Sequence, residues 1–145
     1  MLDIVIAVDG SENALEAVRH ALKLCSANAQ IRLHLLNVQP PLPLAVSRFV
    51  NHDVIRAFHQ EEGQKSLTAA RALLDQEKIP YEWYIAVGDV ADSIVSYAKD
   101  KRCEQILMGT RGLSSLPSLL LGSVATRVLH LAEVPVTLIP RKRRK

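Results

Sequence analysis

The sequence predicts a single α/β domain, in which an open five-stranded parallel sheet carries helices on both faces. Short apolar runs alternate from end to end with longer segments whose apolar residues recur every three or four positions, the pattern of strands alternating with helices. The short runs are apolar almost throughout, as in strands that are buried on both faces of a parallel sheet. The 145 residues suit one domain, and 48% hydrophobic with 23% charged residues excludes a wholly disordered chain.

The first half of the chain predicts two strands and two helices. Residues 2–8 form a branched apolar strand that ends at the turn of residues 9–11. In the helix that follows, Ser11 or Asp9 is the expected cap, and one face is apolar: Ala14, Ala17, Val18, Ala21, Leu22 and Cys25. Residues 31–38 are the second strand.

The connector after the second strand is rich in proline. Residues 40–50 predict an exposed connector, although the PxxP spacing that begins at Pro40 is also compatible with polyproline recognition. A helix is predicted over residues 51–77, with Leu67, Ala70 and Leu74 on one face, and Gly63 weakens its middle.

The second half repeats the alternation. Residues 81–87 are the third strand, and a helix with Val90, Ile94, Val95 and Ala98 on one face follows it. The fourth strand is predicted over residues 105–108, a loop over residues 109–121 and a short helix from Ser123. Residues 134–139 form the fifth strand, and Pro135 inside it predicts a place at the edge of the sheet.

Net charge and cysteine content exclude several classes of protein. The formal net charge is +3, but the last five residues are all Lys or Arg, so the rest of the chain carries −2. A domain of residues 1–140 with a basic tail of residues 141–145 is therefore expected, without a specific nucleic-acid surface. No apolar run approaches the length of a membrane span, no secretory leader is visible, and two cysteines are too few for a disulfide scaffold, so we expect a cytoplasmic protein with no membrane partner.

The candidate site follows the fourth strand. In sheets of this kind ligands bind beyond the carboxyl ends of the strands, which selects Asp9, Val38, Gly88 and above all Gly109. Gly109 begins a loop that contains Gly112 and ends at Gly122-Ser123, where a helix starts.

This loop has the properties of a phosphate cradle. Positive φ is expected at its glycines, which also allow close approach of a ligand. Ser123 offers a hydroxyl at the helix cap, and the first N–H groups of the helix, on Ser123, Val124 and Ala125, form an anion site to which Arg111 and Arg127 could add charge. The alternative is that the glycines serve a tight loop and a helix cap alone.

The spacing of these residues resembles a known family. Gly109-x2-Gly112-x9-Gly122-Ser123 matches the G-2x-G-9x-G(S/T) signature of the ATP-binding branch of the universal stress protein family. Residues 4–11, 33–38 and 134–139 resemble the first, second and last strands of that family, in the same order. The resemblance covers nearly the whole chain and implies the Rossmann-like fold that the family shares with the adenine nucleotide alpha-hydrolases.

The resemblance also implies a ligand and the residues that hold it. The implied ligand is ATP with Mg²⁺ or a similar ion, and the implied assembly is a homodimer joined through the last strand. Asp9 would bind the ribose or help hold the metal. For the other parts of the nucleotide, the resemblance implies the backbone of Ala7 and Val38 at the adenine, Met108 and Gly109 near the ribose, and Gly112, Gly122, Ser123, Val124 and Ala125 at the phosphates. Arg111 is included in the predicted site for its charge beside the phosphates.

Several alternatives stay open at this point. Pro117 stands in the nine-residue part of the loop where many relatives have small residues, so a diphosphate, a monophosphate or a cyclic nucleotide is also compatible. The absence of a GxxxxGK[ST] segment and of HExxH spacing argues against a P-loop enzyme and a zinc site. The resemblance implies at most slow ATP hydrolysis. Cys103, beside Lys101 and Arg102, could carry thiolate character.

Three functions are compatible with the sequence: a nucleotide-binding stress or signalling module, a slow ATPase, and a nucleotide-free interaction protein.

Overall fold

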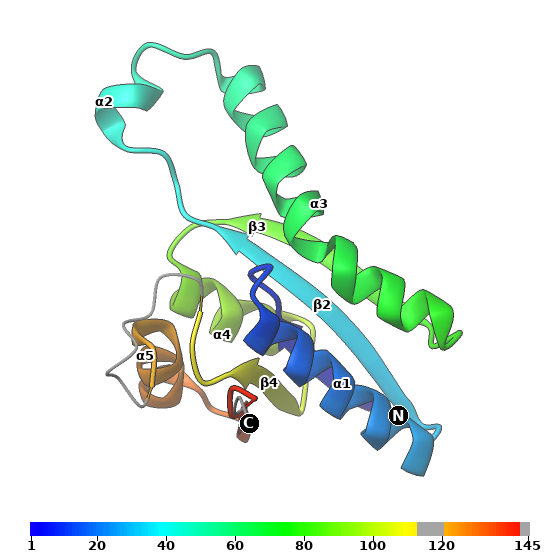
Figure 1. Cartoon of the computed structure of the whole chain (residues 1–145). Helices are drawn as coiled ribbons and strands as arrows, with labels where there is room; N and C mark the ends of the chain where they lie inside the picture. The colour runs from blue at the N-terminus through cyan, green and yellow to red at the C-terminus, as the bar shows by residue number, and fades with distance from the viewer. Residues whose placement is uncertain (113–120, 143–145) are drawn as a thin grey trace.

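The chain folds around one five-stranded parallel sheet, and the computed structural model describes residues 1–112 and 121–142 (Figure 1). The strand order is β3-β2-β1-β4-β5. The strands run β1 Leu2–Ala7, β2 Ile31–Gln39, β3 Tyr81–Val87, β4 Gln105–Gly109 and β5 Val136–Ile139. The predicted α/β class and parallel sheet are therefore confirmed.

The central strand β1 pairs with strands that continue in opposite directions along the sheet. Its neighbours are β2, where Ile4 pairs with Leu33, and β4, where Ile4 pairs with Gln105. The chain thus builds outward to β3 on one side and to β5 on the other, and the strand order reverses between β1 and β4. This reversal opens a crevice at the carboxyl ends of the two strands.

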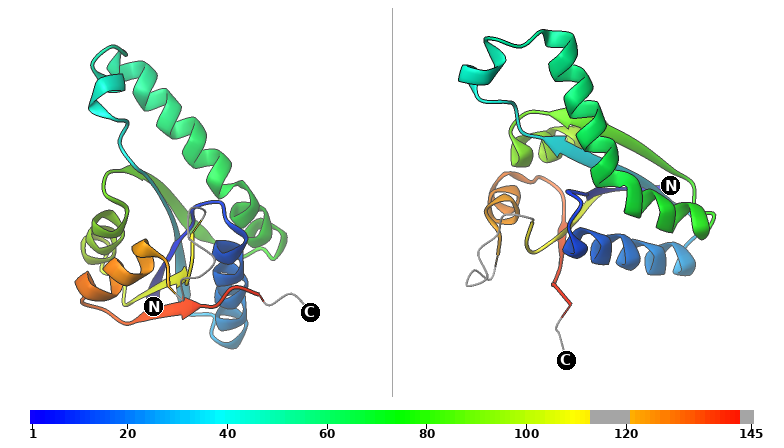
Figure 2. Two further views of the ribbon diagram at one scale, coloured as in Figure 1. Left: turned by 60° about the vertical axis from the view of Figure 1, so that its left-hand side comes forward. Right: turned by 45° about the horizontal axis from the view of Figure 1, so that its top comes forward.

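Helices cover both faces of the sheet, as Figure 2 shows. The helices are α1 Glu12–Ala27, α2 Leu44–Ser47, α3 His52–Gln76, α4 Val90–Asp100 and α5 Ser123–Leu131. Alternate side chains of β1 enter the two cores: Ile4 and Ile6 pack with α1 and α3, whereas Val5 packs with α4 and α5. Burial on both faces explains why the strands read as continuous apolar runs.

The connector after β2 differs from the expectation. Residues 44–47 form the short helix α2, and with the first turns of α3 this connector stands clear of the sheet (Figures 1 and 2). Gly63 lies where α3 crosses β3, because a Cβ atom there would lie 2.6 Å from Cγ2 of Ile85. The glycine thus allows close packing in a helix that it was expected only to weaken.

The last strand begins later than predicted. Pro135 lies immediately before β5, and its carbonyl accepts a hydrogen bond from the N–H of Ile106 at 3.0 Å. Because proline has no N–H to donate, the strand begins at Val136, two residues after the predicted start at residue 134. The predicted edge position of this strand is confirmed by the strand order.

None of the helices in the part of the chain that the structure describes has the length and apolarity that a membrane crossing requires.

Candidate functional site

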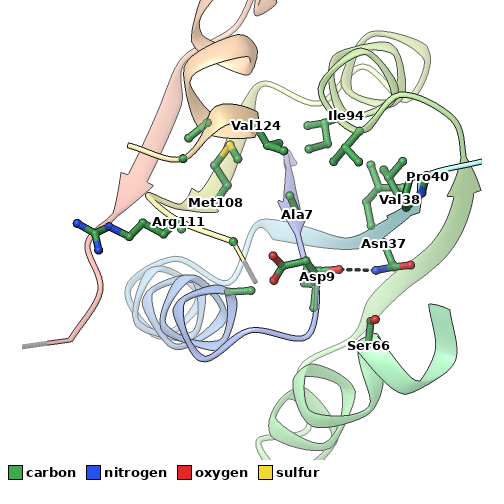
Figure 3. Close-up of a pocket in the computed structure, with 18 of the residues that line it drawn as sticks. Ala7, Asp9, Asn37, Val38, Pro40, Ser66, Ile94, Met108, Arg111 and Val124 are labelled. Carbon is green, nitrogen blue, oxygen red and sulfur yellow. Dashed lines mark hydrogen bonds between the residues drawn. The ribbon is translucent and has the colours of Figure 1, made fainter. Parts of the chain in front are cut away.

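A cavity of about 400 Å³ lies at the carboxyl ends of β1 and β4, where the strand order reverses (Figure 3). The structure brings every predicted site residue to its wall: Ala7, Asp9, Val38, Met108, Gly109, Arg111, Gly112, Gly122, Ser123, Val124 and Ala125. Of the strand ends selected from the sequence, only Gly88 does not line it. Residues 113–120, which include Pro117, lie outside the described residues.

One end of the cavity is apolar. Val38 at the end of β2, Ile94 on α4 and Met108 on β4 face this space around the backbone of Ala7, and Pro40 closes the side (Figure 3). These side chains come from four elements that pack in the core, so the wall is formed by the fold itself. Such a wall suits a flat apolar ring.

The other end of the cavity is polar. The Asp9 carboxylate faces it, and the backbone of residues 109–112 and of the α5 N-terminus encloses it (Figure 3). Asp9 is also held locally, because its Oδ1 accepts a hydrogen bond from the N–H of Ser11 at 2.9 Å. Ser11 caps α1 through the N–H of Ala14, so the two residues predicted as alternative caps have separate roles.

The glycines of the loop serve packing rather than unusual backbone angles. Among the described residues, positive φ at glycine occurs only at Gly10 and Gly88, so the expectation for Gly109, Gly112 and Gly122 was wrong. A Cβ on Gly109 would lie 2.6 Å from Cγ of Asn13, and one on Gly112 would lie 2.7 Å from Oδ2 of Asp9. The absence of a side chain is what these two positions require.

The start of α5 is open to a ligand. Gly122 is the N-cap, with φ −70° and ψ 163°, and no side chain caps the helix in the described part of the chain. The expectation that the Ser123 hydroxyl caps the helix was therefore wrong, since Ser123 is already the first helical residue. The first N–H groups of the helix have no partner within it and form a partial positive charge at the wall of the cavity.

The two arginines considered from the sequence lie differently. The chain of Arg111 lines the cavity, but its guanidinium points away from it (Figure 3). Arg127 does not line the cavity and lies 3.7 Å from the Asp89 carboxylate and 3.5 Å from that of Asp92. The positive character of the polar end therefore comes mainly from backbone N–H groups.

Asn13, which no sequence pattern singled out, holds the start of the loop in place. The buried Asn13 amide donates from Nδ2 to the carbonyl of Ile139 at 2.9 Å. Its Oδ1 accepts from the N–H of Arg111 at 2.9 Å and from the Thr110 hydroxyl at 3.3 Å. One side chain of α1 thus joins the end of β5 to the loop after β4, and its position among the small residues of a helix start gave no signal of this.

Other residues of the wall were also missed. Glu62 and Ser66 of α3, with Asn37 of β2, line the cavity. Asn37 is buried and donates from Nδ2 to the Val8 carbonyl at 2.8 Å, the bond drawn in Figure 3. The only available signal was polarity at the end of an otherwise apolar strand. Glu62 and Ser66 carry no signal in the sequence, because they reach the site through the packing of α3.

The remaining titratable groups do not form a second centre. Within residues 1–112 and 121–142, no three His, Cys, Asp or Glu side chains gather as metal ligands. The thiol of Cys103 is buried, and burial raises its pKa to about 11, with the Asp3 and Glu104 carboxylates adding to the effect. The thiolate character suggested by the neighbouring Lys101 and Arg102 is therefore wrong.

The sequence and the fold match known proteins over most of their length. A family model described as the universal stress protein family matches residues 1–140. Universal stress protein MJ0531 of Methanocaldococcus jannaschii is 31% identical over 144 residues, which span 98% of this chain and 84% of that protein. The structure of universal stress protein MJ0577 of the same organism superposes with a TM-score of 0.82 at 27% identity, covering 98% and 97% of the two chains.

Two further structures share the fold at lower identity. A universal stress protein family protein of Arabidopsis thaliana with AMP bound gives a TM-score of 0.71 at 21% identity, over 98% of this chain and 93% of that one. The universal stress protein of Archaeoglobus fulgidus in complex with dAMP gives 0.70 at 24%, over 96% and 98%. With the match over residues 1–140, these likenesses lead to one conclusion: the chain belongs to the universal stress protein family.

Proposed function

We propose that this universal stress protein binds an adenine nucleotide, ATP in the first place, in the cavity at the carboxyl ends of β1 and β4. It would act as a stress-response or signalling module whose interactions depend on occupancy. The observation that carries the proposal is the division of one cavity into an apolar end and an end lined by backbone N–H groups. An adenine nucleotide has the same two parts, a flat base and a polyanion.

The apolar end is the proposed adenine site. The base would lie among Val38, Ile94 and Met108, where apolar area is removed from water without loss of a protein hydrogen bond. The backbones of Ala7 and Val38 would contact its edge. The structures of family members with AMP and dAMP support this choice of base.

The polar end is the proposed phosphate site. Phosphate oxygens would accept from the N–H groups at the start of α5, where the helix dipole favours an anion. The residues proposed for this end all line the cavity: Gly112, Gly122, Ser123, Val124 and Ala125. The spacing of Gly112, Gly122 and Ser123 is that of the signature of the ATP-binding branch. The cavity volume of about 400 Å³ is within the range of small-molecule sites.

The donor set of the cavity fits Mg²⁺ bound together with the nucleotide. Carboxylate oxygens suit this ion, which usually binds through one or two protein carboxylates and substrate phosphates. Asp9 lies at the polar end, and its Oδ2 is 2.7 Å from the position of a Cβ on Gly112. Asp9 would therefore hold the metal, whose charge would neutralise the phosphates.

The last strand is the proposed dimer contact. β5 is at an edge of the sheet, and all four of its residues are only partly buried in the single chain. Pairing with a second β5 would satisfy its open N–H and C=O groups, which otherwise invite aggregation.

Nucleotide binding is tested by chromatography of the denatured protein and by titration calorimetry with ATP, ADP and AMP. We expect adenine nucleotide to copurify, and Gly122→Val to weaken binding roughly 10- to 100-fold by placing a branched side chain at the phosphate end. Leu129→Val, on the exposed side of α5, is the control for valine in this helix. Absence of copurified nucleotide together with no heat from any of the three ligands would contradict the proposal.

A further inference from the structure

The segment that stands clear of the sheet carries an unusual amount of exposed apolar surface. We call this segment, residues 41–61, the arm; it comprises the connector with α2 and the first turns of α3 (Figures 1 and 2). Five large apolar side chains of the arm are 43% to 86% exposed: Leu44, Val46, Phe49, Val54 and Phe58. Phe49, at 86%, is almost entirely in water.

Two of these side chains form a stripe on the outer face of α3. Val54 and Phe58 are four residues apart and therefore lie above one another on the helix. The adjacent face of the same turns, about 100° round the helix, carries Ile55 and His59, which line a cleft against Pro41 and Leu42 of the connector. The connector thus covers one face of the helix, whereas Val54 and Phe58 stay exposed to solvent.

The exposed apolar area of the whole arm is comparable with that of a dimer interface. At these exposed fractions the five side chains leave about 500 Å² of apolar surface in water, at the upper end of what single proteins expose. Since interfaces are about 57% apolar, such a patch belongs to an interface of about 900 Å² per partner. Standard interfaces bury about 800 Å² per partner, so an interface that includes all five side chains reaches this size.

The charges of the arm are complementary to the arm itself in an antiparallel arrangement. Near its tip, Arg48 and Arg56 with Asp53 give a net charge of +1. The turn of α3 where the arm joins the body carries −1, from Glu61, Glu62 and Lys65. A two-fold axis near residue 56 brings the tip of one arm to the base of the other and opposite charges together. The same axis places Val54 against Phe58 of the second copy.

We propose that the arm is a self-association surface, on which two copies of this chain pair through the outer faces of α3 in antiparallel orientation. This contact is separate from the edge of β5 and needs no nucleotide.

The first test measures self-association by sedimentation velocity over a range of concentrations. Val54→Glu with Phe58→Glu places carboxylates in the stripe at exposed helical positions, where folding tolerates them. We expect one association step of the wild type to weaken by about 100-fold or more, since two central contacts are lost. Ala72→Glu with Gln76→Glu adds the same charge at the same four-residue spacing, at exposed positions of α3 outside the arm, and should leave that step unchanged. Circular dichroism verifies that all variants are folded.

The second test examines the orientation by oxidative crosslinking in a Cys25→Ser background. Val54→Cys and Phe58→Cys proteins are oxidised separately and as a mixture. We expect the mixture to give a disulfide-linked dimer far more efficiently than either protein alone, because position 54 faces position 58 of the other copy. A mixture of Gln64→Cys and Phe58→Cys is the control and should not crosslink.

The outcomes decide the proposal. Equal sedimentation behaviour of wild type and the Val54→Glu/Phe58→Glu variant over the whole concentration range would overturn it, and the patch would then serve a different protein. Loss of the association step without preferential crosslinking of the mixed pair would overturn the antiparallel arrangement. Loss of the step with preferential crosslinking supports both parts, whatever nucleotide the protein carries.

Discussion

The Asn13 side chain occupies the space that a side chain on Gly109 would need. Its Cγ lies 2.6 Å from the position of a Cβ on Gly109, while its Oδ1 accepts from the N–H of Arg111 at 2.9 Å. The glycine at the end of β4 and the amide on α1 are therefore a matched pair: the amide fits only because the glycine has no side chain. The pair fixes where the loop leaves the sheet.

Gly109→Ala is expected to lower the free energy of unfolding by about 1–3 kcal/mol, because the added methyl displaces a buried amide in a packed site. Urea unfolding measures the effect. In a double-mutant cycle with Asn13→Ala, the cost of the glycine substitution should largely disappear, since the clashing group is gone. Additive losses would show that the two residues do not share this space.

Gly112→Ala is expected to weaken nucleotide binding about tenfold with little change in stability. The new Cβ would lie 2.7 Å from Oδ2 of Asp9 and would turn that carboxylate out of its position at the polar end. Calorimetric titration with ATP measures the loss. In an Asp9→Ala background the same substitution should have almost no further effect, and a full tenfold loss there would assign Gly112 a role independent of Asp9.

Asp3→Asn is expected to destabilise the protein at pH 7 by about 2 kcal/mol. The Asp3 carboxylate accepts from Nε of Arg32 at 2.6 Å and lies 2.8 Å from Nε2 of the buried His34. The hydrogen bond from Arg32 is the main cause that holds the pKa of Asp3 below its ordinary 3.8, against the opposing effect of burial, and His34 adds to the lowering. A carboxyl whose pKa is lower in the folded state stabilises the fold above the unfolded pKa and loses that contribution as pH falls through the folded pKa.

The pH dependence tests this assignment. Below about pH 4 the unfolding free energy of the wild type should fall more steeply than that of Asp3→Asn, so the two curves converge in acid. Asp100→Asn, at an exposed helix end, is the control. It should leave the slope of unfolding free energy against pH in the acid range unchanged. Parallel curves for wild type and Asp3→Asn would show that the carboxyl has an ordinary pKa in the fold.

The Cys103 thiol is expected to be inert in the folded protein. With a pKa of about 11, roughly one thiol in a thousand is ionised at pH 8, and burial also shields this reactive thiolate from the reagent. In a Cys25→Ser variant, the reaction with a disulfide reagent should be at least about 100-fold slower in native buffer than in urea. Equal rates in the two conditions would contradict the burial.

Removal of residues 141–145 is expected to change nucleotide affinity by less than about twofold. These residues supply the positive net charge of the chain, but the cavity is lined by residues 7 to 125. Titration of the shortened protein with ATP at low and moderate salt measures the effect. A loss that is large at low salt and vanishes at high salt would show that the tail attracts the ligand.

The fold could be predicted because its information is local. The strand β3 has the predicted bounds, Tyr81–Val87, since apolar patterning and the flanking Pro80 and Gly88 mark both ends. The glycines and the serine of the family signature all line one cavity. They could be found from the sequence because they mark the end of one strand and the start of the next helix, which are local features.

The parts that could not be predicted depend on contacts between distant segments. Asn13 lies 126 positions from the carbonyl that it binds, and Gly63 is required by Ile85 on another element. The backbone angles of the loop glycines were predicted wrongly because a glycine serves close packing as often as it serves a left-handed turn, and the sequence does not distinguish the two. The helix α2 is four residues long, too short for any periodicity.

Both roots of the arm border the cavity. Gln39 and Pro40, where the connector leaves β2, and Glu62 and Ser66, where α3 rejoins the body, are part of the same wall. The two ends at which the arm joins the body of the protein therefore both lie in the wall of the same cavity. If a ligand that binds in the cavity fixes these wall residues, it changes the free energy of association of the arm. By thermodynamic linkage, association of the arm must then change the free energy of ligand binding by the same amount.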